Sequence, residues 1–388
     1  MRSRAFLLFV VALFAAAASL AAAPRAGSTP VEWQAGALDL PLAWQVTTGG
    51  PASVVAVVDS GVQADHPALQ GRVLPGYDFV HGDTNANDDN GHGTAVAGII
   101  ASVCPGCRIL PVKVLDEHRT GDWPTIAAGI VWAADHGAQV INLSVGGAHA
   151  LDVVAAAVAQ AVSKGVIVVA AAGNDGSDES FYPASYPGVI SVAAVDQTGA
   201  RSSFSNFGGG ITVAAPGCAT APWLESGYTS DFCGTSTAAP FVAGLAGLAR
   251  AFDPTLVPQA FLQALTDSAS PLLDSSTASH GVPDANRLLV DLGAPSSAPV
   301  ANTPPAVPVA PKAGRRLLAR VGEWRGASSY RVEWQRFAGK AGWRTVVSGP
   351  AFTPRPADRG SRLRVLVTAA NVRGSTTAVS APSPFVTP

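Results

Sequence analysis

Three residues whose types together can activate a hydroxyl nucleophile lie far apart in the chain: Asp59, His92 and Ser236. Asp59 follows the apolar run Val54–Val58, and an acid at the carboxyl end of a buried strand is costly unless it has a partner. His92 lies in Gly91–Thr94 at the start of a predicted helix, where glycine neighbours let the backbone come close to other segments. An imidazole beside a carboxylate can take the proton of a serine hydroxyl.

Ser236 lies in Gly234–Pro240, again at the start of a predicted helix, where Pro240 suits the first turn. A serine there is close to free backbone N–H groups and to the positive end of the helix dipole, and both stabilise a negatively charged oxygen. Each of the three residues alone is more often structural, as a buried acid, a packed or surface histidine, or a helix cap. Their order and their glycine-rich settings together predict nucleophilic catalysis.

Apolar runs alternate with helical patterns in the region that carries these residues. Strands are predicted at Ser53–Val58, Arg108–Leu115, Gln139–Val145, Val166–Ala171 and Val189–Val195, and helices at Thr94–Ser102, Pro124–His136, Leu151–Ser163, Ala238–Phe252 and Thr255–Thr266. The strands are nearly continuous in Val, Ile and Ala, which favours parallel strands covered on both faces. The alternation predicts an α/β domain with reactive groups at the carboxyl ends of its strands.

Three segments of this region resemble the signature blocks of the subtilisin-like serine proteases: Val57–Val62, Gly91–Gly98 and Gly234–Gly244. The resemblance runs from about Trp33 to about Leu292. It implies a three-layer α/β fold with a mainly parallel sheet and peptide-bond hydrolysis through an acyl-enzyme. It also implies the roles of orienting acid, base and nucleophile for the three residues above.

Two more segments support the resemblance. Ala170–Asn174 looks like the segment that supplies the oxyanion-hole asparagine, which implies Asn174 together with the backbone N–H of Ser236. Asn142–Gly147 is similar to the strand that pairs with the substrate backbone. The substrate-binding residues that this implies are Ser144, Val145, Gly146, Ala172 and Gly173.

The small residues of Ala170–Gly173 predict a roomy pocket for the substrate residue before the cut. We therefore expect broad specificity with an apolar or aromatic preference at that position. Asp175 near the rim either admits a basic side chain or is a solvated loop acid. The same triad is also suited to acyl transfer or ester hydrolysis, and an inactive binding protein with this fold is the third alternative.

The chain begins with a basic leader, an apolar run from Ala5 to Leu20 and Ala21–Ala23. This is the order of a secretory signal peptide over residues 1–23, and an uncleaved anchor is disfavoured because the run is short for a membrane span. We expect a secreted protein, periplasmic or extracellular, without a later membrane span. Hydrophobic residues make up 48% and charged residues 13% of the chain, which fits a buried-sheet enzyme.

Four cysteines in an exported protein are expected to form disulfides, and four allow three pairings. We favour the two local pairs, Cys104 with Cys107 and Cys218 with Cys233. The Cys104–Cys107 turn lacks a second motif of its kind, so a zinc or redox role is disfavoured.

No cofactor and no required metal are expected. Well-known subtilisins hold a calcium ion in a loop after the histidine-bearing helix, and here that connection is only Ser102–Cys107. A weak or structural calcium site could still use the oxygen-bearing residues before His92, although a polar surface loop is the favoured interpretation. These residues are Asp83, Asn85, Asn87, Asp88, Asp89 and Asn90.

The chain changes character after the residues of the resemblance. We predict a catalytic domain at 24–293, a stiff Pro/Ala-rich linker at 294–312 and a small all-β sandwich at 313–388 that resembles a bacterial immunoglobulin-like repeat. From Lys312 onward there are 14 basic and three acidic residues, while the preceding part holds 11 basic and 24 acidic residues. The arginines could contact an anionic surface or polymer, dock on the acidic domain or simply cover exposed strand faces. Protein or peptide substrates are the expected partners, and nucleic acid is not.

Overall fold

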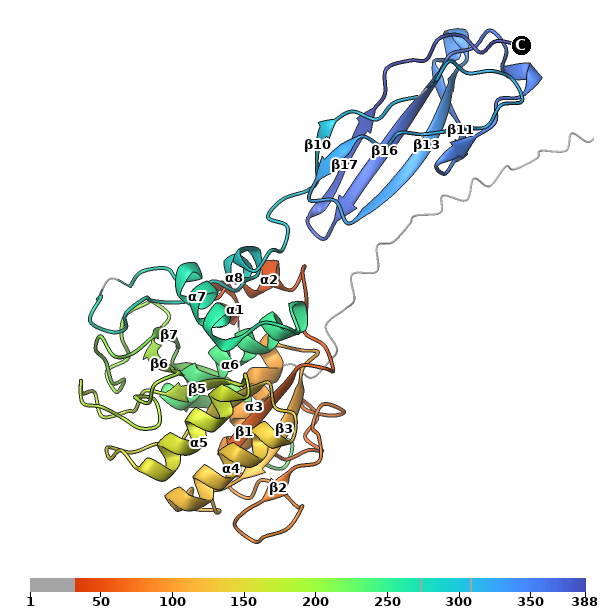
Figure 1. Ribbon diagram of the computed structural model, residues 1–388. Coiled ribbons are helices and arrows are strands. Elements are labelled where there is room, and N and C mark those ends of the chain that lie inside the picture. Colours follow the sequence, from red (N-terminus) through yellow and green to blue (C-terminus); the bar gives the residue numbers. More distant parts are fainter. Residues whose placement is uncertain (1–31, 273, 308) are drawn as a thin grey trace, which may run out of the picture.

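The computed structural model describes residues 32–388 except 273 and 308. The predicted leader at 1–23 lies outside these residues. The described chain forms an α/β region up to α8 and an all-β region from β10 onward (Figure 1). No helix among the described residues is long and apolar enough to cross a bilayer.

A seven-stranded sheet forms the centre of the α/β region, in the order β2-β3-β1-β4-β5-β6-β7, and every neighbouring pair is parallel. The strands are β1 (Val54–Asp59), β2 (Tyr77–Asp78), β3 (Arg108–Lys113), β4 (Val140–Leu143), β5 (Ile167–Ala171), β6 (Val189–Val195) and β7 (Val213–Pro216). The strand β1 pairs with β3 on one side and with β4 on the other, so the strand order reverses at β1. Crevices at the carboxyl ends of strands at such a reversal are where open α/β sheets bind ligands.

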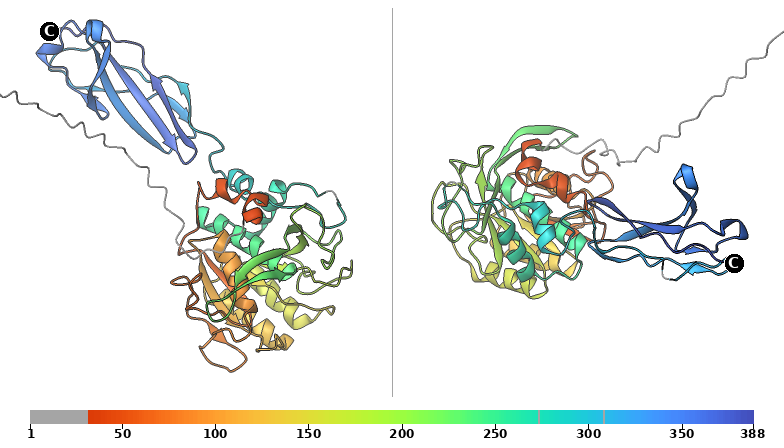
Figure 2. Two further views of the ribbon diagram at one scale, coloured as in Figure 1. Left: turned by 180° about the vertical axis from the view of Figure 1, so that it is seen from behind. Right: turned by 90° about the horizontal axis from the view of Figure 1, so that it is seen from above.

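Helices cover both faces of this sheet, which gives three layers (Figures 1 and 2). One face packs on α3 (His92–Val103), α6 (Thr235–Phe252), α7 (Pro258–Ser268) and α8 (Ala285–Asp291), together with α1 (Glu32–Ala37) and α2 (Leu40–Ala43). The other face packs on α4 (Trp123–Asp135) and α5 (Asp152–Ser163). The three-layer α/β architecture with a mainly parallel sheet, which the sequence predicts, is therefore confirmed.

Strand geometry explains why apolar residues run without a break through β1. Successive side chains point to opposite faces, so Val55 and Val57 join the core under α3 and α6, while Ala56 and Val58 join the core under α4 and α5. The start of α4 is also explained by its sequence. Asp122 caps α4 by accepting a hydrogen bond from the backbone N–H of Thr125 at 2.7 Å.

A disulfide-linked hairpin precedes α6 and was not predicted. It consists of β8 (Cys218–Pro222) and β9 (Tyr228–Cys233), and Cys218 lies directly opposite Cys233 in the ladder. The two cysteines are bonded, as are Cys104 and Cys107, so the structure contains both local pairs that the sequence favours. The hairpin leads straight into the segment that carries Ser236.

The region after α8 is built of antiparallel strands around the buried Trp334. A four-stranded sheet has the order β14-β13-β16-β17, and β10 pairs with β12 and β11 with β15. The bounds are β10 (Val300–Thr303), β11 (Leu317–Leu318), β12 (Glu323–Arg325), β13 (Ser329–Phe337), β14 (Trp343–Ser348), β15 (Ala351–Phe352), β16 (Leu363–Asn371) and β17 (Gly374–Val379), with short 3₁₀ turns η1 (Gly339–Ala341) and η2 (Pro356–Asp358).

The predicted linker at 294–312 contains a strand that was not predicted. Its residues Val300–Thr303 form β10, whose partner β12 lies about twenty residues further along the chain. A strand that is fixed by such a partner has no periodicity of its own for a local pattern to reveal.

We expect the disulfide of the hairpin to stabilise the fold mainly by restricting the unfolded chain. Its cysteines are 15 residues apart, so replacing Cys218 and Cys233 by Ala should lower the free energy of unfolding by about 3 kcal/mol. The matched variant Cys104→Ala/Cys107→Ala removes a disulfide that closes a loop with a sequence separation of only 3. By the same relation it should lower the free energy of unfolding by about 1.5 kcal/mol. Urea unfolding of both variants measures the difference, and a larger loss from the shorter loop would contradict this explanation.

Candidate active site

Asp59 is the last residue of β1, the strand at which the sheet order reverses, and its side chain is fully buried. Its Oδ1 accepts hydrogen bonds from the backbone N–H of Ser60 at 2.7 Å and from Nδ1 of His92 at 2.8 Å. Its Oδ2 has no hydrogen-bond partner among the described residues. The pair with His92 is thus the main compensation for burying this carboxylate.

His92 is the first residue of α3 and is almost completely buried. The start of this helix can approach β1 because residue 93 is glycine: a Cβ there would lie 2.0 Å from the carbonyl oxygen of Gly61. An ionised carboxylate only accepts hydrogen bonds, so the Nδ1 of His92 carries the proton of the bond to Asp59. The Nε2 atom is then free to act as a proton acceptor.

Ser236 is the second residue of α6 and lines the same cleft as His92, a cavity of about 410 Å³. Its Oγ donates a hydrogen bond to the carbonyl oxygen of Ser144 at 3.4 Å, and no hydrogen bond joins the described side chains of Ser236 and His92. Hydrogen bonds of this kind are often long or absent in free enzymes and form when substrate binds. The structure therefore brings the three predicted residues to one end of the sheet, with only the acid and the histidine in direct contact.

Asn174 follows the carboxyl end of β5 and is oriented by Thr235. Its Oδ1 accepts from the backbone N–H of Thr235 at 2.8 Å and from the Thr235 hydroxyl at 3.0 Å, so its Nδ2 donors point elsewhere. A Cβ on Gly234 would lie 3.5 Å from this Nδ2 and 3.6 Å from the backbone nitrogen of Ser236. The two donors thus lie within about 4 Å of one point beside Gly234. The role of Thr235 was not predicted, although it lies between Gly234 and Ser236.

The segment Ser144–Gly146 continues from β4 past the last ladder pair of that strand and runs beside the nucleophile. The buried Asn142 donates from Nδ2 to the Ser144 hydroxyl at 2.9 Å, and this hydroxyl donates to the carbonyl oxygen of Ser236 at 3.2 Å. Gly147 is held by a pair of backbone hydrogen bonds with Tyr182, each 2.8 Å long. The segment is therefore fixed at both ends relative to Ser236.

Ala172 and Gly173 are buried on the other side of Ser236, and Asp175 is exposed. The ring of Phe181 lies close to both Gly146 and Gly173, beside the pocket that the small residues predict. A Cβ on Gly146 would lie 2.2 Å from Cε1 of Phe181, and one on Gly173 would lie 2.9 Å from Cγ of the same ring. The pattern of small residues could not reveal this ring, because Phe181 comes from a separate loop.

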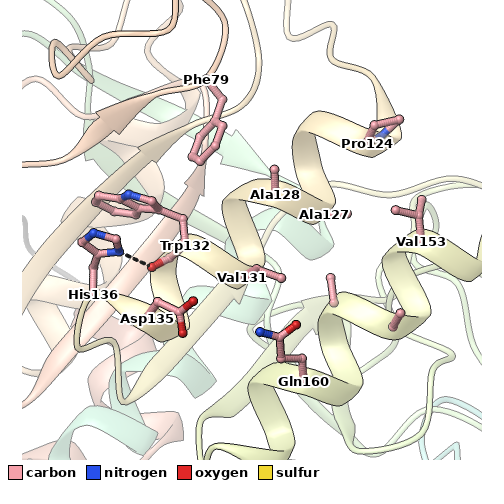
Figure 3. Close-up of a pocket in the computed structure, with 12 residues that line it drawn as sticks. Phe79, Pro124, Ala127, Ala128, Val131, Trp132, Asp135, His136, Val153 and Gln160 are labelled. Carbon is pink, nitrogen blue, oxygen red and sulfur yellow. Dashed lines mark hydrogen bonds between the residues drawn. The ribbon is translucent and has the colours of Figure 1, made fainter.

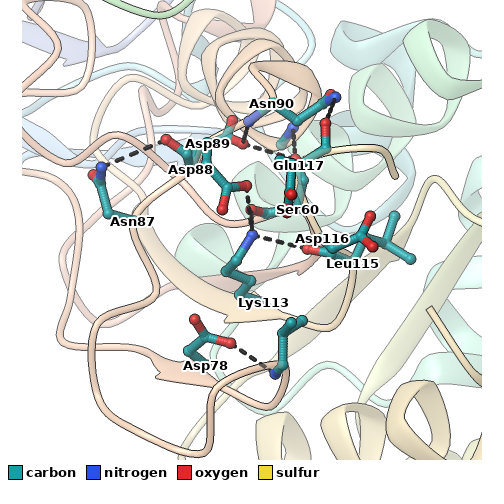
Figure 4. Close-up of polar contacts among 12 residues, drawn as sticks. Ser60, Asp78, Asn87, Asp88, Asp89, Asn90, Lys113, Leu115, Asp116 and Glu117 are labelled. Carbon is teal, nitrogen blue, oxygen red and sulfur yellow. Dashed lines mark hydrogen bonds and ion pairs between the residues drawn. The ribbon is translucent and has the colours of Figure 1, made fainter. Parts of the chain in front are cut away.

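The acidic loop before His92 makes protein contacts instead of forming a cation site (Figure 4). Asp88 accepts hydrogen bonds at Oδ1 from the Ser60 hydroxyl and two backbone N–H groups, and at Oδ2 from the backbone and hydroxyl of Thr94. Asp89 pairs with the buried Lys113 at 2.7 Å. Among the described residues no group of three or more acidic, histidine or cysteine side chains is arranged to hold a metal. This donor set therefore does not fit the calcium site considered from the sequence.

Lys113 is a supporting residue that sequence reasoning missed. Its Nζ donates to the carbonyl oxygens of Ser60 at 2.8 Å and Leu115 at 2.9 Å as well as to Asp89. These contacts hold the backbone immediately after Asp59 and along one wall of the cleft (Figure 4). The available signal in the sequence was the pair Asp88-Asp89 before His92 together with Lys113 near the end of a predicted buried strand.

A separate groove of about 550 Å³ lies between α4 and α5 and shares no lining residue with the cleft (Figure 3). Trp132 and His136 stack there at 3.9 Å between ring centres, and His136 Nδ1 donates to the carbonyl oxygen of Trp132 at 2.8 Å. Its lining is mostly Ala, Val and aromatic side chains. It holds none of the predicted site residues and is not part of the candidate active site.

Comparison with known proteins agrees with this geometry. Residues 50–292 match the model of the family described as the subtilase family. The chain belongs to the subtilase family. It is a subtilisin-like serine endopeptidase, and hence a hydrolase, as its relatives and structural neighbours indicate.

Two relatives illustrate the similarity. Thermitase of Thermoactinomyces vulgaris is 45% identical over 225 residues, which are 54% of this chain and 79% of thermitase. The thermophilic serine proteinase of Bacillus sp. strain AK1 is 46% identical over 216 residues, 53% of this chain and 54% of that protein. The match thus spans about half the length of the second relative.

Two solved structures share the fold. A cold adapted subtilisin-like serine proteinase superposes with a TM-score of 0.57 at 33% identity, covering 62% of this chain and 89% of that one. A lanthipeptide protease superposes with a TM-score of 0.63 at 27% identity, covering 67% of this chain and 94% of that one.

Proposed function

We propose that this protein hydrolyses peptide bonds with Ser236 as nucleophile, His92 as general base and Asp59 as the acid that orients it. The observation that carries the proposal is the 2.8 Å hydrogen bond between Asp59 and His92 Nδ1, with His92 and Ser236 lining one cleft. Asp59 holds the tautomer in which Nε2 is the acceptor, and stabilises the imidazolium that forms during reaction.

The reaction proceeds in two halves. His92 takes the proton of the Ser236 hydroxyl while Oγ bonds to the carbonyl carbon, and the tetrahedral intermediate then expels the amine, which receives the proton from His92. A water molecule enters, gives its proton to His92 and attacks the acyl-enzyme, and the proton returns to Ser236 as the acid leaves. The Asn174 amide and the Ser236 backbone N–H bind the oxyanion in each half.

Substrate binds as an added strand along Ser144, Val145 and Gly146. Main-chain hydrogen bonds of this kind give affinity that does not depend on sequence, which supports broad specificity. The residue before the cut lies against Ala172 and Gly173, and their apolar surroundings support the expected apolar preference. Whether that residue is aromatic depends on the space that Phe181 leaves.

Labelling with a fluorophosphonate probe tests the nucleophile. We expect wild-type protein to react at Ser236 and to cleave a denatured protein, because the neighbouring base makes this hydroxyl reactive. Ser236→Ala should lose both properties, and Ser163→Ala, an exposed serine at the end of α5 and outside the cleft, should keep the label. Labelling without proteolysis would favour acyl transfer or ester hydrolysis, and no labelling of folded protein would favour a binding protein.

Removing the Asn174 donor should slow turnover. We expect Asn174→Ala to lower kcat by about 10²–10³ with little change in KM, because the oxyanion develops only during reaction. Asn174→Asp keeps the shape and the acceptor for Thr235 but cannot donate, so it should lose as much. Steady-state kinetics on a peptide substrate measures both, and near wild-type kcat in the Asp variant would exclude a donor role.

We further propose that the leader at 1–23 directs secretion, to the periplasm or outside the cell, where the two disulfides are stable. No cofactor takes part in the reaction described above. The catalytic domain is proposed at 24–293, and the antiparallel strands after it are proposed to form an immunoglobulin-like sandwich centred on Trp334. Contact of its arginines with an anionic surface stays a prediction.

Deleting residues 294–388 should leave cleavage of small peptides unchanged, because the cleft is lined only by residues of the α/β region. Arg373 of the β16–β17 turn donates to the carbonyl oxygens of Leu42 at 2.8 Å and Pro295 at 3.1 Å. Its guanidinium also donates to Asn286 Oδ1. The control is therefore Arg373→Ala in the full chain, which removes these three side-chain contacts and keeps the all-β region. Loss of peptide kcat/KM in the folded deletion variant would contradict a modular organisation.

A further inference from the structure

The half-buried ring of Phe181 lies between the two segments that flank Ser236. On one side it contacts Gly146, where a Cβ would meet its Cε1 at 2.2 Å and its Cδ1 at 2.9 Å. On the other side it contacts Gly173, where a Cβ would meet its Cγ at 2.9 Å. The Tyr182 carbonyl oxygen, at 2.6 Å from the Cβ position of Gly146, and the Asn206 amide nitrogen, at 2.4 Å from that of Gly173, share this space. Among the described residues, the ring is the one group that lies against both glycines.

This space is next to the proposed position of the scissile bond. Gly173 precedes Asn174, whose amide shares an open space with the backbone nitrogen of Ser236, and Gly146 follows Ser144, whose carbonyl contacts Ser236 Oγ. A substrate that lies along Ser144–Gly146 with its carbonyl in that space must direct the side chain before the cut between Gly146 and Gly173. Phe181 is what that side chain meets.

The backbone around Phe181 is fixed. Tyr182 makes two backbone hydrogen bonds to Gly147, each 2.8 Å long. The backbone nitrogen of Phe181 donates to the Ser185 hydroxyl at 3.2 Å, and its carbonyl accepts from the backbone nitrogen of Ser185 at 2.9 Å. The ring is therefore held against the glycines by a loop with defined contacts on both sides of its Cα.

Phe181 also lines a second cavity next to the cleft. This cavity of about 210 Å³ is lined by Phe181 and Ala172 but not by Gly146 or Ser236, whereas the catalytic cleft is lined by Gly146 and Ser236. The ring thus borders the second cavity and lies against Gly146, which borders the cleft.

We propose that Phe181 closes the pocket for the residue before the cut, so that the enzyme cleaves after small residues such as Ala, Gly and Ser and discriminates against aromatic ones. This inference rests on the proposed function and narrows the apolar or aromatic preference expected from the sequence. Even one methylene group that a pocket cannot accommodate changes kcat/KM by tenfold or more, and a whole ring differs by much more.

Two peptide p-nitroanilides that differ only in Ala or Phe before the cleaved bond test the inference. For wild-type enzyme we expect kcat/KM for the Ala substrate to exceed that for the Phe substrate by at least about tenfold. Phe181→Ala removes the ring beside Gly146 and Gly173, and should reverse this preference. The matched control is Phe207→Ala, which enlarges the same second cavity while leaving Phe181 in place, so the Ala/Phe ratio should stay as in wild type.

The two hypotheses fail differently. If wild-type enzyme shows fluorophosphonate labelling at Ser236 and cleaves the Phe substrate at least as fast as the Ala substrate, the closed pocket is overturned while the proposed function stands. If neither labelling nor cleavage occurs, the proposed function itself fails. Because the wild-type ratio needs no variant, the test holds even if Phe181→Ala does not fold; Phe181→Leu, which keeps an apolar side chain there, should then give an intermediate ratio.

Discussion

The buried carboxylate of Asp59 is the constraint on which the active-site end of the molecule depends. A charge with no access to water must be met by donors, and Asp59 finds them in Ser60 N–H and His92 Nδ1. The second donor is available only if the start of α3 comes against the end of β1, which requires glycine at 93 facing Gly61. The position of His92, the proposed base, therefore follows from the need of the buried Asp59 carboxylate for a hydrogen-bond donor.

The residue after Asp59 connects this pair to its support. The Ser60 hydroxyl donates to Asp88 and accepts from the backbone nitrogen of Gly93, while the Ser60 carbonyl accepts from Lys113. Two further buried charges thus hold the turn that follows β1 (Figure 4). A network whose members are all hydrogen-bonded is rigid, and rigidity is what keeps a base and a nucleophile in register. The same contacts engage the carboxylates of Asp88 and Asp89 with protein donors.

Sequence reasoning located elements whose signal is local. The runs ending at Asp59 and at Ala171 form β1 and β5 within a residue of the predicted bounds, since strands buried on both faces are continuously apolar. It missed β9 and β10, because their residues are largely polar or exposed and pairing alone defines them. Thr235, Lys113 and Phe181 were missed for a related reason. Each makes at least one contact with a segment more than twenty residues away, and local spacing in the sequence does not register such contacts.

This division between local and distant signals matches a division of labour in the site. The groups proposed for the chemistry lie at the end of β1, just after β5 and at the starts of α3 and α6, so that regular structure positions them. Glycines at 146 and 173 leave the walls of the cleft without side chains, so the walls themselves select nothing by size. In the closed-pocket proposal the size of the pocket depends on Phe181, a loop residue, and a loop can change such a residue without disturbing the scaffold. The sheet would then position the reacting groups, and the proposed choice of substrate would depend on Phe181.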